Sequence, residues 1–457
     1  SYLLREPFGI SMMTSIAIAA PLIGCCPPNI IRGLPFWPMK VWTWAAGALA
    51  LAAVGGVAGF GIAAHQQLGE ITHAPPFELQ AAPSALVPAE PSRIDDTSLT
   101  NALTTLGANP ALGTYGARVS RASDGATVFE HAPGDALRPA SVTKVLTASA
   151  ALLSLGAQDR VTTQVVRGAD PAEVTIKAAG DVWLDADALD DLATQIGHAD
   201  RVLIDTSVWD GMEEMLPGWN PLDIDGGFVA PLQPAMLSGG RLNGETTGDV
   251  PRSHTPALDV AQALANRVGA TEVGVGTAPA DGQVAAAVES PTLAERLEMM
   301  MKHSDNVYAE AIGREVALKR GTKDAPGAAL SVLAERGFDT AGVVLRDNSG
   351  LSTEDRIAPK LLDELLHSAA TGPELRPLLS TLPVAAGEGT LLDRFGDLPG
   401  RGWVRAKTGT LDGTASLAGT VTSVNGNVYT FALICNDADV LAARRAMDEF
   451  TSALREF

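Results

Sequence analysis

The 457-residue sequence is poor in cysteine, in aromatic residues and in positive charge. Its three cysteines are Cys25, Cys26 and Cys435, and the first two are adjacent in an N-terminal leader. Only Cys435 is left for the globular part, so an internal disulfide is excluded there. The apolar residues around Cys435 predict a strand, in which this cysteine is a buried core residue.

Aromatic residues make up only 5% of the chain, which disfavours a base-stacking surface. Lysine and arginine total 33 against 53 aspartates and glutamates, and the net charge is -20 at pH 7. Such an acidic protein repels nucleic acid, so we expect no nucleic-acid partner. The seven histidines are scattered, without a HExxH pattern or paired ligand spacing. We therefore predict no metal and no cofactor.

One uncharged apolar run extends from Val41 to Ala64. As a helix it would reach roughly 36 Å, which is enough to cross a bilayer. Arg32 and Lys40 precede the run and Glu70 follows it, so the positive-inside rule places the globular part on the extracytoplasmic side. We predict a single-pass membrane anchor at residues 40–64. A cleaved signal peptide, which would give a secreted protein, is the alternative.

The segments on either side of this run lack the pattern of a packed core. Residues 1–39 contain a second apolar stretch and the run Leu22-Ile23-Gly24-Cys25, which resembles a lipoprotein box but recurs easily by chance. We interpret residues 1–39 as an N-terminal extension, with Met39 as a candidate start. Residues 65–98 are rich in proline and alanine and predict a semi-extended linker.

The globular part begins near residue 99 and mixes strand and helix patterns. The strands are predicted at Tyr115 to Val119, Ala126 to Glu130, Gly402 to Thr410, Ala415 to Thr422 and Val428 to Cys435. Apolar patterns predict helices at Ser141 to Leu155 and at Asp437 to Phe457. The two ends of the domain would thus supply one antiparallel sheet with flanking helices, which is an α+β fold.

Residues 165–289 hold further elements and are predicted to be an inserted α/β subdomain. Its strands and helices are expected at Glu173 to Lys177, Arg201 to Asp205, Ala188 to Ile196 and Ala257 to Val268. The main domain would then consist of residues 99–164 and 290–457.

Three short motifs occur in order along the main domain. They are Ser141-Val142-Thr143-Lys144, Ser304-Asp305-Asn306, and Lys407-Thr408-Gly409 followed by Thr410. The set S-x-x-K, S-D-N and K-T-G is found in β-lactamases and penicillin-binding proteins. Each motif alone is weak, because S-x-x-K should arise by chance about once in such a chain and K-T-G roughly one time in ten. Alone, the serines could be helix caps and the lysines solvated surface residues.

The predicted context of the motifs changes this interpretation. Ser141 begins an apolar helix, and Lys144 lies three residues on, on the same face. A lysine in the first turn of a buried helix is unfavourable without a role. Ser304-Asp305-Asn306 falls between two helical patterns, and Lys407-Thr408-Gly409 ends a strand. A helix N-terminus, an interhelix loop and a strand edge are the walls that a serine–lysine site needs.

The chemistry of such a site follows from its residue types. A serine hydroxyl needs an adjacent base, and Lys144 can serve if burial and the nearby cation Lys407 lower its pKa. The backbone N–H groups of Ser141 and Thr410 are natural oxyanion donors. Ser304 can relay a proton to the leaving amine, and Asn306 can bond the substrate amide.

The predicted site therefore has two parts. The catalytic residues are Ser141, Lys144, Ser304, Asn306 and Lys407. The substrate-binding residues are Asp305, Thr408, Gly409 and Thr410, and Thr408 with Lys407 can hold a substrate carboxylate.

From about Leu103 to the end, the sequence resembles the class C low-molecular-mass penicillin-binding proteins, a family of serine D-Ala-D-Ala carboxypeptidases and endopeptidases. The resemblance includes PASVTKVLTASAALLSLG at 139–156, SPTLAERLEMMMKHSDNVYAE at 290–310, DNSGLS at 347–352 and KTGTLDGTASLAG at 407–419. It implies a β-lactamase/transpeptidase-like domain and an acyl-enzyme mechanism on peptidoglycan stem peptides. It also implies covalent inhibition by penicillins and other β-lactams.

Alternatives of the same fold are a β-lactamase, an esterase or amidase, and a catalytically silent wall-binding protein. The sequence leaves open the balance of carboxypeptidase and endopeptidase action, the third residue of the peptide and the oligomeric state. The insert is short for the family, so one or two inserted domains remain open.

Overall fold

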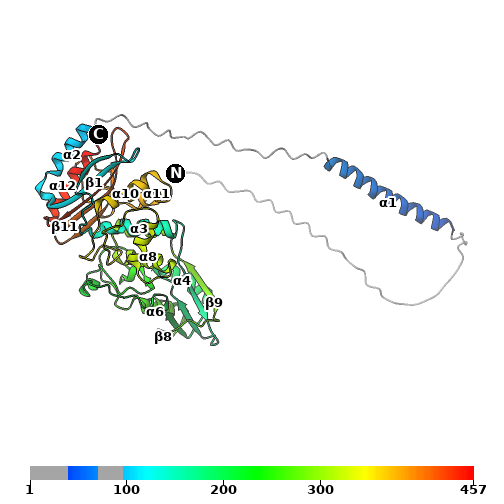
Figure 1. Cartoon of the computed structure of the whole chain (residues 1–457). Helices are drawn as coiled ribbons and strands as arrows, with labels where there is room; N and C mark the ends of the chain where they lie inside the picture. The colour runs from blue at the N-terminus through cyan, green and yellow to red at the C-terminus, as the bar shows by residue number, and fades with distance from the viewer. Residues whose placement is uncertain (1–39, 70–95) are drawn as a thin grey trace, which may run out of the picture. The chain divides into compact units, whose positions relative to one another are not determined.

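A computed structural model describes residues 40–69 and 96–457, and the chain divides into one unit of residues 1–87 and another of residues 88–457 (Figure 1). The described part of the first unit is helix α1 (Lys40–Gly69). Its span Trp44–Gln66 is long and apolar enough to cross a membrane and is 0% buried, and a signal sequence would look the same. The predicted extension at residues 1–39 and most of the linker lie outside the described residues.

The main sheet of the second unit joins strands from the two ends of the domain, as predicted. Its order is β10-β11-β12-β1-β2, and every neighbouring pair is antiparallel. The strands are β1 (Thr114–Arg121), β2 (Thr127–His131), β10 (Val404–Leu411), β11 (Thr414–Thr422) and β12 (Val428–Asn436). The central position of β12 explains why Cys435, a free cysteine, is fully buried.

Helices cover both faces of this sheet because its strands are apolar on both sides. On one face α2 (Asp96–Gly107) and α12 (Val440–Ala453) enclose an apolar core that includes Leu433. On the other face α10 (Pro359–Thr371) packs against strand residues such as Ile434 and joins a second core. Successive residues of a strand point to opposite faces, so β12 serves both cores.

A layer of helices forms the centre of the second unit (Figure 1). Around α3 (Thr143–Ser154) lie α7 (Leu293–His303), α8 (Asn306–Lys319), α9 (Ala325–Glu335) and α11 (Arg376–Thr381). The predicted helix at Ser141 is confirmed, although its first turn, Ala140–Val142, is a 3₁₀ helix. Ten consecutive residues of α3, from Thr143 to Leu152, are buried, so α3 is the central helix.

A second sheet, of order β8-β6-β4-β3-β9, lies at the far end of this helical layer from the main sheet (Figure 1). Its strands are β3 (Thr162–Arg167), β4 (Glu173–Lys177), β6 (Arg201–Asp205), β8 (Glu272–Val275) and β9 (Gln283–Glu289). The helices α4 (Ala186–Ile196) and α6 (Pro256–Val268) bury its core. A two-stranded sheet of β5 (Asp181–Leu184) and β7 (Ala235–Leu237) and the short helix α5 (Leu222–Asp225) complete the region.

The chain enters and leaves this region through two paired strands. Thr162 of β3 lies opposite Glu289 of β9, so the ends of the segment are side by side. This geometry agrees with an insertion, although residues 88–457 form one compact unit. The inserted subdomain at 165–289 therefore remains our proposal.

Candidate active site

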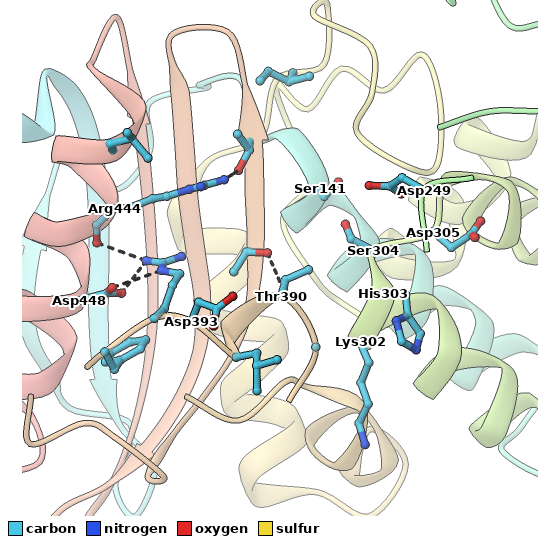
Figure 2. A pocket seen from close by; sticks show the side chains of 18 of the residues that line it. Ser141, Asp249, Lys302, His303, Ser304, Asp305, Thr390, Asp393, Arg444 and Asp448 are labelled. Carbon is cyan, nitrogen blue, oxygen red and sulfur yellow. Dashed lines mark hydrogen bonds and ion pairs between the residues drawn. The ribbon is translucent and has the colours of Figure 1, made fainter. Parts of the chain in front are cut away.

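An open cleft of about 1390 Å³ lies between the edge strand β10 and the helical layer (Figure 2). Six of the predicted site residues line it: Ser141, Ser304, Asp305, Asn306, Thr408 and Thr410. They come from the 3₁₀ turn before α3, from the turn between α7 and α8 with the first residue of α8, and from β10. The three motifs, separated by more than a hundred residues each along the chain, thus meet at one place.

Two tight backbone contacts hold the turn that carries Ser141. Ala140, the residue before it, has φ +50°, a left-handed conformation that costs a non-glycine residue about 1 kcal/mol or more. Gly350 packs on this turn so closely that a Cβ there would lie 2.0 Å from the carbonyl oxygen of Ala140. The turn is therefore fixed by its neighbours, and Ser141 stays half-buried at the cleft.

The K-T-G strand approaches the same turn from the sheet. A Cβ on Gly409 would lie 2.1 Å from Oγ of Ser416 and 2.7 Å from the carbonyl oxygen of Pro139, and only 3.0 Å from the backbone nitrogen of Ser141. Glycine is needed here because any side chain would push β10 away from the nucleophile. The hydroxyl of Ser416 donates to the Pro139 carbonyl at 2.6 Å and ties the turn to β11.

The ammonium nitrogen of Lys144 lies at the centre of a compact polar cluster. Its Nζ is 2.9 Å from Oγ of Ser141, 2.8 Å from Oδ1 of Asn306 and 2.7 Å from the backbone carbonyl oxygen of Ser349. The side chain is fully buried. The predicted contact between Ser141 and Lys144 is thus present in the structure.

Burial changes the protonation of this lysine. Desolvation lowers the pKa of Lys144 to about 8, because a charged ammonium is poorly stabilised away from water. Four carboxylates oppose this fall: Asp347, Asp305, Glu310 and Asp355. At pH 7 roughly a tenth of the side chain is therefore the neutral amine, far more than for a lysine with the ordinary pKa.

Lys407 forms the opposite, sheet-side part of the site. Its Nζ donates to Oγ of Ser304 at 2.8 Å and to the carbonyl oxygen of Thr408 at 2.9 Å. Burial, and next the charge of Lys144, hold the pKa of Lys407 well below its ordinary value. Ser304 itself ends α7 in the left-handed conformation, at φ +59°, which aims its hydroxyl into the cleft.

Asp305 is the most enclosed residue of the S-D-N motif. One oxygen, Oδ2, accepts hydrogen bonds from Arg241 and Arg252, and the other, Oδ1, caps α8 by accepting from the backbone N–H of Tyr308. Burial would raise the pKa of this carboxyl, but Arg252 and Arg241 outweigh it and hold the pKa well below the usual range. Both oxygens are thus engaged within the protein, and the predicted contact of Asp305 with substrate stays a prediction.

The remaining predicted residues lie along β10 or on α8. Thr408 donates its hydroxyl to Oγ1 of Thr390 at 2.8 Å, and Thr410 is exposed to the cleft. Asn306 uses its amide nitrogen to donate to the carbonyl oxygen of Phe228 at 3.1 Å. Its side chain therefore connects the lysine cluster to the backbone at Phe228, which also lines the cleft.

The chain matches the D-Ala-D-Ala carboxypeptidase 3 (S13) family over residues 99–250 and 243–454. It belongs to this family of serine peptidases. The predicted resemblance to penicillin-binding DD-peptidases is therefore confirmed, and so is the predicted enzyme class, a serine-type D-Ala-D-Ala carboxypeptidase.

Relatives of this family agree with the assignment over most of their length. Carboxypeptidase DacB of Mycolicibacterium smegmatis is 43% identical over 387 residues, which are 78% of this chain and 84% of the relative. A carboxypeptidase of Mycobacterium tuberculosis is 38% identical over 410 residues, covering 83% of this chain and 88% of that one.

The fold has a counterpart among solved structures. Penicillin binding protein 4 of Haemophilus influenzae superimposes with a TM-score of 0.64 at 22% identity, covering 80% of this chain and all of the other. The same protein has been solved with a β-lactam, and that structure gives a TM-score of 0.57 at 21% identity. These likenesses confirm the predicted α+β, transpeptidase-like fold of this S13 peptidase.

The segment DNSGLS at 347–352 belongs to the family resemblance, but sequence reasoning gave this loop no place in the lysine cluster. Asp347 accepts from the backbone N–H groups of Gly350 at 2.6 Å and Ser352 at 2.7 Å, and this turn presents the Ser349 carbonyl to Lys144. The signal was present as Asp347-Asn348-Ser349-Gly350, since an aspartate followed by a glycine favours such a turn. Arg241 and Arg252 gave no sequence signal, because their partner Asp305 lies 64 and 53 residues away.

Proposed function

We propose that this S13 peptidase removes the terminal D-alanine from peptidoglycan stem peptides through an acyl-enzyme on Ser141, and that β-lactams acylate the same oxygen. The observation that carries the proposal is the 2.9 Å contact between Oγ of Ser141 and the buried Nζ of Lys144 in the cleft. A hydroxyl within hydrogen-bond reach of a base near its working pH is an activated nucleophile.

The partners of Lys144 suit a neutral amine. Such an amine has two N–H donors and one lone pair. The carbonyl oxygens of Asn306 and Ser349 can only accept, so they take the two donors. The lone pair is left facing the hydroxyl of Ser141, which is the arrangement that a general base requires.

Acylation would proceed in one addition and one elimination. Lys144 takes the proton of Ser141 as Oγ attacks the carbonyl carbon of the penultimate D-alanine. The backbone N–H groups of Ser141 and Thr410 would stabilise the oxyanion, as donors fixed before the reaction. Collapse of the tetrahedral intermediate breaks the peptide bond and leaves an ester on Ser141.

The departing D-alanine needs a proton on its amine. Ser304 can deliver it, because its hydroxyl lies in the cleft and receives a hydrogen bond from Lys407 at 2.8 Å. The proton that Lys144 took from Ser141 then replaces the one that Ser304 gave, so Lys144 is a neutral amine again. A water molecule then attacks the ester, with Lys144 as base, and releases the shortened peptide. A β-lactam would follow the same first step, but its ring-opened amine stays attached to the acyl group.

Mass spectrometry of penicillin-treated protein tests this proposal. We expect the adduct on the peptide that contains Ser141, its complete loss in Ser141→Ala and its retention in Ser304→Ala at a lower rate. An adduct on Ser304 would contradict the role assignment. Turnover of a D-Ala-D-Ala peptide with slow adduct loss supports a DD-peptidase, whereas fast penicillin hydrolysis or no adduct would support a β-lactamase or a silent binding protein.

We also propose that α1 anchors the enzyme in the cell membrane with its catalytic unit outside the cytoplasm. The support is the uncharged run at 41–64 preceded by Arg32 and Lys40. Protease added to intact spheroplasts should then destroy the catalytic unit. Complete protection would contradict this topology, and a shortened, released protein would indicate a cleaved signal.

A further inference from the structure

The positive charge of the cleft is unevenly compensated. Most of the basic side chains that line it already have acidic partners: Arg241 and Arg252 share Asp305, Lys302 pairs with Glu298 and Glu388, and Arg394 pairs with Asp448. Among the described residues that line the cleft, Arg444 and Arg445 are the two arginines without an ion pair.

Arg444 is directed at β10, the strand that carries the K-T-G motif, whereas Arg445 is exposed. Figure 2 shows Arg444 extending from α12 toward the part of the cleft that holds Ser141. Its Nη2 donates a hydrogen bond to Oγ1 of Thr410, the residue that follows the K-T-G motif. Thr408 and Thr410 lie two positions apart on β10 and both line the cleft, so their hydroxyls share one face with this guanidinium.

The surroundings of Arg444 leave its charge available. Asp448 is the nearby carboxylate, but its short contacts are with Arg394. Burial, and then the charge of Arg394, lower the pKa of Arg444, while Asp448 opposes the fall. A guanidinium remains protonated despite such a shift, so Arg444 is a permanent cation.

Lys407 is poorly suited to the role of substrate cation that its motif suggested. Its side chain is fully buried, and its ammonium donates to Ser304 and to the Thr408 carbonyl. Arg444, half-buried at the cleft wall, can offer its remaining N–H groups to a ligand. Carboxylates are the anions that a guanidinium recognises best, because its forked donors match two oxygens.

We propose that Arg444, with the hydroxyls of Thr408 and Thr410, binds the C-terminal carboxylate of the peptide substrate. This inference rests on the proposed DD-carboxypeptidase function and deepens it. A peptide with a free terminus would gain a charge-assisted contact that an amidated or extended peptide lacks. Arg444 would then be the residue that favours removal of a terminal residue over cleavage of an internal bond.

The test compares a D-Ala-D-Ala peptide with its C-terminal amide, in the wild type and in Arg444→Gln. We expect kcat/KM for the free acid to fall roughly 10- to 100-fold in the variant, because losing a hydrogen bond to a charged group weakens binding by a factor of that size. The value for the amide should change less than about threefold, within the effect of a surface substitution. Arg320→Gln, at an exposed arginine outside the cleft that pairs with Glu335, is the control and should leave both values unchanged.

Three outcomes decide the matter. A selective loss on the free acid, with partial recovery in Arg444→Lys, supports the inference. An equal loss on both peptides would overturn it, because Arg444 would then only hold Thr410 in place. If the wild type cleaves neither peptide, the proposed function itself fails, and this inference fails with it.

Discussion

The helical wall of the cleft and its sheet wall each bury a lysine, and the two lysines differ in their charged surroundings. Around Lys144 four carboxylates offset part of the effect of burial, and its pKa settles near 8. Among the described residues no carboxylate offsets burial at Lys407 in the same way, and Lys144 adds like-charge repulsion, so the pKa of Lys407 is held well below its ordinary value. Acidic neighbours thus determine which lysine titrates in the range of a general base.

The largest effect should follow from replacing Lys144, the lysine whose pKa is about 8. Lys144→Arg should lower the acylation rate by penicillin roughly 10²- to 10⁴-fold, because a guanidinium cannot accept a proton. Stopped-flow measurement with a fluorescent penicillin gives the rate. Lys360→Arg, at a half-buried lysine of α10 that pairs with Glu364 outside the cleft, should behave like the wild type. If Lys144→Arg keeps most of its acylation rate, Lys144 is not the base.

The carboxylates of the helical wall also support the fold. Asp305→Asn should lower the free energy of unfolding by about 3–5 kcal/mol, because it leaves two buried arginines without their partner. Urea unfolding followed by circular dichroism checks this value. Asp437→Asn, which breaks the exposed ion pair with Arg138, should change stability by at most about 1 kcal/mol. Equal effects of the two changes would show that Asp305 contributes no more to the free energy of unfolding than an exposed ion pair does.

Replacing Lys407, on the sheet wall, by arginine should have a smaller effect than the same change at Lys144. Lys407→Arg is expected to slow acylation only about tenfold, because a guanidinium can still donate to Ser304 and to the Thr408 carbonyl. The same stopped-flow assay measures it, and thermal melting verifies that the variant folds. A loss as large as that of Lys144→Arg would show that Lys407 must also release a proton.

The smallest effect should appear in the pH profile. Acylation by the wild type should rise with pH through a midpoint near 8, because only the neutral form of Lys144 accepts a proton. The carboxylate of Glu310 raises this pKa, so Glu310→Gln should move the midpoint to lower pH. Glu354→Gln, an exposed residue paired with Arg346, should leave it in place. A midpoint that moves to higher pH would contradict the stated role of the acidic cluster.

Much of the fold followed from local pattern. The predicted strands at 173–177 and 201–205 are β4 and β6 with the bounds that the structure has, and those predicted at 402–410, 415–422 and 428–435 correspond to β10, β11 and β12. The strands β8 and β9 were not predicted. Both are half-exposed edge strands of the second sheet, so their apolar pattern is weak.

The candidate site likewise has a part that the sequence predicted and a part that it did not. The sequence by itself predicted that Ser141, Lys144, Ser304 and Lys407 belong to the candidate site. Each of them is part of a short motif whose spacing reflects a local element. It also determined that Lys144 faces Ser141, since residues three apart on a helix share a face.

Only the tertiary structure decided what surrounds them. The Ser349 carbonyl, the paired arginines on Asp305 and the guanidinium of Arg444 come from segments distant in the chain. Their effects act through space: burial and neighbouring charge set the pKa of Lys144, and packing against Gly350 and Gly409 fixes the turn of Ser141. Such effects depend on distances between elements, and no local pattern in the sequence contains those distances.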